Sequence, residues 1–152
     1  MSRVVAIVNQ KGGVGKTATA VSLAAALAIA ERSTLLIDAD PQANSTRALG
    51  FPEDPERASL YEAIRGDASL TDLKLPVKEL PCLSLVPADQ NLVGAEIELV
   101  EQPGREYRMR QILEAATDTG EHVFIDCPPS LGLLTLNAVV AADSVLIPVQ
   151  CE

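Results

Sequence analysis

The chain has 152 residues, of which 47% are hydrophobic and 22% charged, so it is long and apolar enough to form one domain around its own core. Its net charge of −9 gives no sign of a nucleic-acid-binding protein, because phosphate contacts need clustered Lys and Arg. Cys82, Cys127 and Cys151 are far apart and form no C-x-x-C pair, so they support neither a disulfide framework nor a zinc site. We expect them to be buried thiols in a reducing cytosol.

The predicted elements begin with a β-branched apolar run, residues 3–8, that is typical of a buried parallel strand. A helix is expected over 16–30, and its small residues on most sides indicate packing in the interior. A second strand over 34–37 ends at Asp38. Residues 41–58 contain several prolines and polar groups, which predicts a loop with short helical turns at most.

Further along, we expect a brief helix over 59–64 stopped by Gly66, a third strand over 83–86, helices over 90–100 and 105–116, a fourth strand over 122–125 ending at Asp126, a helix containing Asn137, and a fifth strand over 144–149. Strands alternating with helices predict an α/β fold with a mostly parallel sheet flanked by helices. We expect residues 1–152 to form a single domain.

No secretory signal opens the sequence, because the N-terminus runs straight into the first predicted strand. The longest apolar stretch, residues 131–149, includes Asn137, Asp143 and Pro148, which favours a buried helix and strand over a membrane span. We therefore expect a cytoplasmic protein with no membrane segment. Since the chain stops directly after its fifth predicted strand, we also expect that it is incomplete at its C-terminal end.

The segment 9–18, NQKGGVGKTA, lies between the first predicted strand and helix. A strand, a glycine loop and a helix together hold phosphates, because loop N–H groups and the positive helix end face the anion. In such a loop Lys16 would reach the β- and γ-phosphates, and the Thr17 hydroxyl would bind Mg²⁺. An ordinary glycine turn is the alternative, but a turn needs no flanking lysines.

The strict pattern G-x-x-x-x-G-K-[ST] fails here, because Gln10 stands where it requires glycine. A second lysine, Lys11, begins the loop instead. The segment resembles the deviant Walker A motif of the ParA/MinD group of ATPases, which implies a P-loop NTPase-like fold that binds ATP and Mg²⁺. The nucleotide-binding residues implied are Lys11, Gly12, Gly13, Val14, Gly15, Lys16, Thr17 and Ala18.

The resemblance implies that Lys11 crosses a dimer interface to the partner's phosphates, as an arginine finger does in trans. A solvated lysine is the alternative. Lys16 would be the fixed catalytic cation in the same subunit. At Ala18 the group usually has a second hydroxyl residue, so nucleotide binding would lose about one neutral hydrogen bond, about 0.5–1.5 kcal/mol.

Two acidic segments follow predicted strands. Asp126 resembles the Walker B carboxylate that holds Mg²⁺, usually through water, and a helix cap or turn acid is the alternative. Residues 38–44, DADPQAN, resemble the second motif of the group. By that resemblance Asp40 orients the attacking water and Asp38 lies near the metal shell, whereas a polar turn is the alternative. The metal residues expected are thus Thr17, Asp38 and Asp126.

Residues 40–44, 87–96 and 125–132 resemble the Soj/ParA branch, which partitions chromosomes and plasmids. The resemblance implies an ATPase with low intrinsic turnover, an ATP-dependent homodimer, non-specific DNA binding and a ParB-type partner that stimulates hydrolysis.

The local basic cluster, Arg105, Arg108 and Arg110, is better explained as a solvated helix face than as a DNA contact. A MinD-like membrane-cycling regulator and a nucleotide-binding module without turnover stay open as alternatives.

Overall fold

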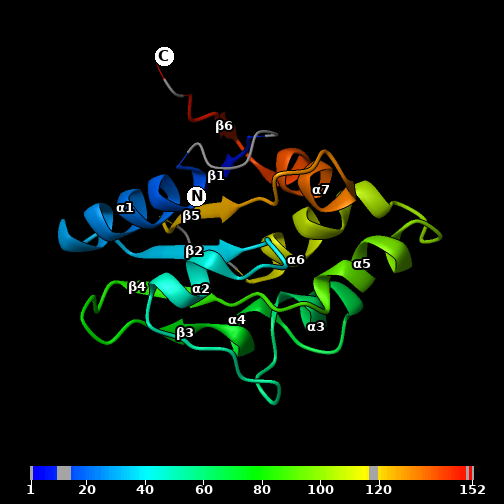
Figure 1. Cartoon of the computed structure of the whole chain (residues 1–152), viewed down its shortest axis with the longest axis horizontal. Coiled ribbons are helices and arrows are strands. Elements are labelled where there is room, and N and C mark those ends of the chain that lie inside the picture. The colour runs from blue at the N-terminus through cyan, green and yellow to red at the C-terminus, as the bar shows by residue number, and fades with distance from the viewer. Residues whose placement is uncertain (1, 10–14, 117–119, 150, 152) are drawn as a thin grey trace.

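The structure is a computed structural model that describes residues 2–9, 15–116, 120–149 and 151 (Figure 1). The strands in these residues are β1 (Arg3–Ile7), β2 (Thr34–Asp38), β3 (Leu75–Pro76), β4 (Leu83–Val86), β5 (His122–Asp126) and β6 (Ser144–Leu146). The helices are α1 (Lys16–Ile29), α2 (Asn44–Ala48), α3 (Leu60–Arg65), α4 (Leu70–Leu73), α5 (Leu92–Leu99), α6 (Arg108–Ala116) and α7 (Leu133–Ala141), with a 3-10 turn, η1, over Arg105–Tyr107. The alternation of strands and helices is that of an α/β domain.

The strands form one sheet in the order β3-β4-β2-β5-β1-β6, in which only the β3–β4 pair is antiparallel. β5 lies between β1 and β2, with Asp126 opposite Ile7 on one side and Asp38 on the other. The mostly parallel sheet flanked by helices is therefore confirmed. Because parallel strands share one carboxyl edge, the ends of β1, β2 and β5 are neighbours there.

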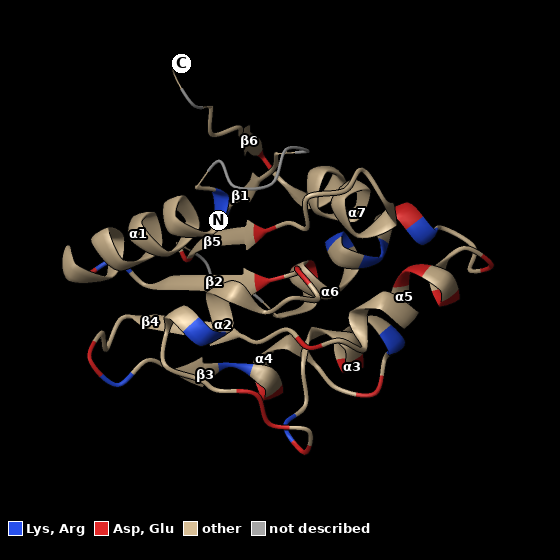
Figure 2. Ribbon diagram, in the orientation of Figure 1, with Lys and Arg blue, Asp and Glu red and all other residues tan. Residues whose placement is uncertain are grey.

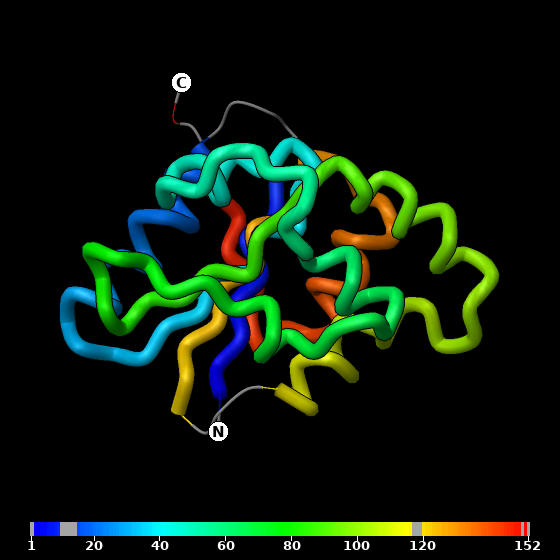
Figure 3. The backbone as a smooth tube through the Cα atoms, turned by 90° about the horizontal axis from the view of Figure 1, so that it is seen from below, coloured from blue at the N-terminus to red at the C-terminus, as the bar shows by residue number. Residues whose placement is uncertain are grey.

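Alternate residues of the strands supply two separate cores, because side chains along a strand point to opposite faces. One face packs against helices α3 to α7, and the other packs mainly against α1 (Figure 3). The strand residues on the first face are Val4, Ala6, Leu35, Ile37, Val86, Val123 and Ile125, and those on the second are Ile7, Leu36, Leu83, Leu85 and Phe124. Burying one such aliphatic side chain stabilises the fold by about 1.5–3 kcal/mol.

Helix α1 is not buried on all sides as its composition suggested. Its buried residues are Lys16, Ala20, Ala24 and Ala28, which recur every four positions on one face. Ile29 is 71% exposed and Leu23 is 37% exposed. Alanine at this spacing lets the helix lie close to the sheet, and Lys16 is the first residue of this buried face.

The sequence prediction also missed two short elements, β3 and α4. β3 has only two residues and contains Pro76, so no alternation of apolar and polar residues marks it. It pairs with β4, opposite Leu85 and Ser84. The last predicted strand, 144–149, is shorter than expected, since β6 ends at Leu146 and Ile147 is 60% exposed.

The remaining differences are at helix ends. The helix expected over 105–116 begins as η1 and continues as α6, and the helix expected over 90–100 is α5. Within the part of the chain that the structure describes, no helix is long and apolar enough to cross a bilayer.

Candidate functional site

Acidic residues end two neighbouring strands at the carboxyl edge of the sheet (Figure 2). Asp38 is the last residue of β2 and Asp126 the last of β5, and the two are paired in the strand register. Both are fully buried. Buried carboxylates side by side are costly unless cations or hydrogen bonds compensate them, so their partners define the site.

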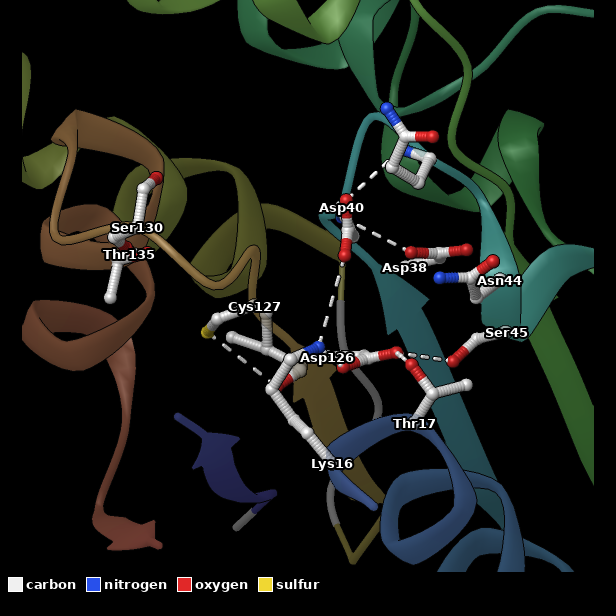
Figure 4. A network of polar contacts seen from close by, with 12 residues as sticks. Lys16, Thr17, Asp38, Asp40, Asn44, Ser45, Asp126, Cys127, Ser130 and Thr135 are labelled. Atoms are coloured by element: carbon white, nitrogen blue, oxygen red, sulfur yellow. Dashed lines mark hydrogen bonds and ion pairs between the residues drawn. The ribbon is translucent and has the colours of Figure 1, made fainter. Parts of the chain in front are cut away.

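Lys16 is the cation at this edge. It is the first residue of α1. Gly15, which directly precedes the helix, has a left-handed φ of 78°. The Lys16 side chain is only 9% exposed, forms an ion pair with Asp126 Oδ1, and places Nζ 3.9 Å from Asp40 Oδ2 (Figure 4). One lysine thus faces acids from two different segments.

Asp126 gathers hydroxyl groups on its other oxygen. Thr17 Oγ1 donates to Asp126 Oδ2 at 3.0 Å, and Ser45 Oγ donates to the same oxygen. Asp126 therefore connects the start of α1 with the start of α2 across the end of β5 (Figure 4).

Asp38 is held by three protein donors. Its Oδ1 accepts from Asp40 N at 3.1 Å, and its Oδ2 accepts from Thr46 N at 2.9 Å and Thr46 Oγ1 at 2.7 Å. Burial, with a further contribution from the charge of Asp126, raises the pKa of Asp38 to about 7, against an ordinary 3.8. The desolvation of this carboxylate outweighs the hydrogen bonds that stabilise its charge.

Asp40 lies in the turn between β2 and α2. Its Oδ1 accepts from Gln42 N at 3.0 Å, and its carbonyl oxygen accepts from Ala43 N at 2.8 Å. Ala43 has a positive φ of 57°, which is unusual for a residue with a Cβ. The other carboxylate oxygen is the one that faces Lys16.

These contacts bring together Lys16, Thr17, Asp38 and Asp126, as expected of neighbouring strand ends, and add Asp40 from the turn after β2. Their assigned roles stay predictions. Ala18 is exposed in the first turn of α1, and Gly15 directly precedes that helix. Lys11, Gly12, Gly13 and Val14 lie outside the described residues, so the predictions for them are not tested by the geometry.

Ser45 and Thr46 are site residues that the sequence analysis missed. Both are buried, at 0% and 1% exposure, and each donates a hydroxyl hydrogen bond to one of the two strand-end acids. Their only signal in the sequence is their position directly after the segment 38–44. Small hydroxyl residues there are equally typical of a helix start, so the contact could not be inferred.

The donor set fits Mg²⁺ together with a polyphosphate. Mg²⁺ keeps several waters and takes one or two carboxylates besides phosphate oxygens, and here a hydroxyl and a carboxylate, Thr17 and Asp126, already meet. Across the described ranges, no group of three or more His, Cys, Asp or Glu could hold a metal by itself. A cation at this edge would therefore need its remaining ligands from water and from a bound anion.

The cysteines take no part in this chemistry. All three are free thiols, and only Cys127 is buried, because Cys82 is half-buried and Cys151 is exposed. The expectation of three buried thiols is thus wrong for two of them. Burial, together with the charge of Asp126, raises the pKa of Cys127 to about 12, so this thiol stays protonated and is a poor metal ligand.

The basic cluster near residue 105 has structural partners. Arg108 donates to the carbonyl oxygens of Ile64 at 2.8 Å and Ala63 at 3.2 Å, at the end of α3. Arg105 donates to Val100 O, and Arg110 pairs with Glu114 one turn along α6. Arg105 and Arg110 are exposed, as expected of a solvated helix face, but Arg108 is half-buried and compensates the dipole at the C-terminal end of α3, so the expectation is wrong for Arg108.

Known proteins share the sequence and the fold of this chain. The model of the AAA_31 family, described as an AAA domain, matches residues 2–152. The chromosome partitioning protein ParA of Myxococcus xanthus is 54% identical over 152 residues, which cover 100% of this chain and 53% of that protein. The sporulation initiation inhibitor protein Soj of Bacillus subtilis is 47% identical over 152 residues, which cover 100% of this chain and 60% of that protein.

A solved structure of similar fold is the cobyrinic acid a,c-diamide synthase from Mycobacterium smegmatis with bound ATP analog and magnesium. It matches with a TM-score of 0.94 and 43% identity, over 100% of this chain and 62% of that one. The chain therefore spans 53% to 60% of the length of the two curated relatives named above.

Proposed function

Because this chain belongs to the AAA_31 family of AAA domains and is of the ParA/Soj type, we propose that it is the nucleotide-hydrolysing part of a DNA-partitioning switch. The proposed reaction is hydrolysis of ATP to ADP and phosphate, with low intrinsic turnover. The observation that carries the proposal is the convergence of Lys16, Thr17 and Asp126 at one sheet edge, with Lys16 Nζ 3.9 Å from Asp40.

Phosphoryl transfer depends on positioning and charge neutralisation, and the residues of this chain divide those tasks. Lys16 would hold the β- and γ-phosphates, while loop N–H groups between residues 11 and 18 would face the phosphate oxygens. Thr17 and Asp126 would hold Mg²⁺, which supplies neutralisation of the phosphate charge when bound. Asp38, paired in register with Asp126, would lie at the outer metal shell with one lone-pair position left beyond its three donors.

Asp40 is the residue that we propose orients the attacking water. It is 4% exposed, its backbone N–H donates to Asp38 and its carbonyl oxygen accepts from Ala43 N, and its carboxylate Oδ2 faces Lys16. A carboxylate in this position can accept a hydrogen bond from water and direct the water's lone pair at the phosphorus. Its removal should leave phosphate binding to Lys16 intact.

The switch behaviour is proposed from the ParA/Soj relatives. Lys11 would reach the phosphates of a partner subunit, so ATP binding would favour a homodimer and hydrolysis would release it. A ParB-type partner protein would stimulate hydrolysis, and the dimer would bind DNA without sequence preference. We propose a cytoplasmic, nucleoid-associated location for such a cycle.

The test is phosphate release by the intact protein, alone and with DNA and its partner, in parallel with Asp40→Ala. We expect wild-type protein to release phosphate faster when both are added. Asp40→Ala should bind ATP with unchanged affinity but release phosphate at least tenfold more slowly at saturating ATP. No phosphate release by the wild type under any of these conditions would refute the proposed activity.

A further inference from the structure

Thr46 joins three segments of the fold through one buried side chain. Its Oγ1 donates to Asp38 Oδ2 at 2.7 Å and accepts from Ala88 N at 3.1 Å. Its own N–H also donates to Asp38 Oδ2, at 2.9 Å. The hydroxyl therefore uses both its donor and an acceptor position, and links the end of β2, the start of α2 and the segment after β4.

The same carboxylate holds the other end of this segment. Asp38 Oδ1 accepts from Asp40 N at 3.1 Å, so Asp38 fastens residues 40–46 at both their beginning and their end. Between these points the turn includes Ala43, whose positive φ of 57° costs about 1 kcal/mol or more in a residue with a Cβ. A strained turn before a five-residue helix does not hold its own shape, because so short a helix has little intrinsic stability.

We propose that Thr46 is a positioning residue for Asp40, acting through Asp38. This inference rests on the proposed function, in which Asp40 orients the attacking water. When the Thr46 hydroxyl is lost, Asp38 loses one of its three donors and Ala88 N loses its acceptor, so the backbone N–H of Thr46 alone holds this end of the turn to Asp38 and the turn is held less firmly. Catalysis is sensitive to displacements of about 1 Å. We expect phosphate binding to Lys16 to change much less, because Lys16 also pairs with Asp126, which lies outside this turn.

The neighbouring hydroxyls of Ser45 and Thr46 donate to different acids. Ser45 Oγ donates to Asp126, the acid that also holds Thr17 and Lys16. Loss of the Ser45 hydroxyl would thus act on the proposed metal residues, and loss of the Thr46 hydroxyl on the turn that contains Asp40. Removing the Ser45 hydroxyl should therefore weaken nucleotide binding, whereas removing the Thr46 hydroxyl should slow turnover.

The experiment compares Thr46→Ala with Thr46→Ser in the intact protein, because both lack the Thr methyl group and they differ by the hydroxyl alone. Thr46→Ala should keep ATP affinity within about twofold and lower phosphate release at saturating ATP at least tenfold, while Thr46→Ser should restore most of it. Thr71→Val, which removes an exposed hydroxyl of α4 that donates to Ala116 O at 3.5 Å and to none of the site residues, is the control and should behave as wild type.

A double variant provides a readout that a purely structural role would not move. In the Asp40→Ala background, Thr46→Ala should have no further effect on phosphate release, because it acts through Asp40. Equal loss in Thr46→Ala and Thr46→Ser, wild-type turnover in Thr46→Ala, or additive losses in the double variant would each overturn the inference. If the wild type releases phosphate and Asp40→Ala does not, those outcomes refute Thr46 alone and leave the proposed function standing.

Discussion

Replacing Asp38 by asparagine should change how the stability of the protein depends on pH. The pKa of Asp38 is about 7 in the folded chain and 3.8 without the fold, so the folded state binds this proton more tightly than the unfolded state does. The resulting stabilisation is fully present below about pH 4 and is lost as the pH rises through about 7. The whole difference corresponds to about 4 kcal/mol, of which about 2–3 kcal/mol is lost between pH 5 and pH 8.

The amide that Asp38→Asn introduces cannot titrate, so its contribution is independent of pH. It also places an N–H₂ group against one of the donors from Asp40 and Thr46, which should cost about 1–3 kcal/mol at every pH. We therefore expect the variant to be less stable than wild type at pH 5 and to recover or exceed wild-type stability at pH 8.

The assay is urea unfolding of the intact protein at both pH values, without Mg²⁺ or nucleotide, because both are proposed to bind near the same carboxylates. Titrating groups that do not interact with Asp38 cancel in the difference between variant and wild type, and Thr71→Val should show a difference that does not depend on pH. If the free energies of unfolding of wild type and Asp38→Asn differ by a constant amount from pH 5 to pH 8, the reasoning is refuted, since Asp38 would then be ionised in the fold at pH 5.

Three further predictions concern the glycine loop and α7. Lys16→Ala should abolish nucleotide binding in calorimetric titration with ATP and Mg²⁺, and wild-type affinity would contradict its assigned role. Lys11→Ala should lose ATP hydrolysis and ATP-dependent dimerisation together, so normal phosphate release and normal sedimentation of a dimer would speak against action in trans. In Gly132→Ala the added Cβ would lie 2.5 Å from a Glu96 carboxylate oxygen, which accepts from Leu134 N at 3.0 Å. We expect the free energy of unfolding to fall by about 1–2 kcal/mol as that carboxylate moves away. An unchanged midpoint in chemical unfolding would show that the Glu96 carboxylate can move without a loss of stability.

The sheet could be predicted from the sequence because its central strands are continuous apolar runs that stop at acids. Asp38 and Asp126 mark the ends of β2 and β5 in the sequence as they do in the structure. The short β3 could not be predicted, since a two-residue strand containing Pro76 exists only through its pairing with β4. The single buried face of α1 could not be predicted either, because alanine on most sides does not indicate which side packs against the sheet.

The candidate site was predictable in its charged residues and not in its hydroxyls. Lys16, Asp40 and Asp126 stand at the ends of predicted elements, where topology alone brings them to one edge. Ser45 and Asp126 are 81 positions apart, and their hydrogen bond depends on how α2 folds back over the strand ends. No local pattern encodes such a contact, so it had to come from the structure.

The ion pair between Lys16 and Asp126 has a consequence for how ligands enter. The two charges compensate each other, so an incoming phosphate that engages the ammonium group alone would leave the buried carboxylate with only its two hydroxyl donors, Thr17 and Ser45, at a cost of at most about 3–5 kcal/mol. A divalent cation that engages the carboxylate alone would leave the ammonium group with Asp40 as its remaining acid, 3.9 Å away. We therefore expect a metal-chelated nucleotide, which exchanges both partners together, to bind at this site more readily than the metal or the nucleotide alone.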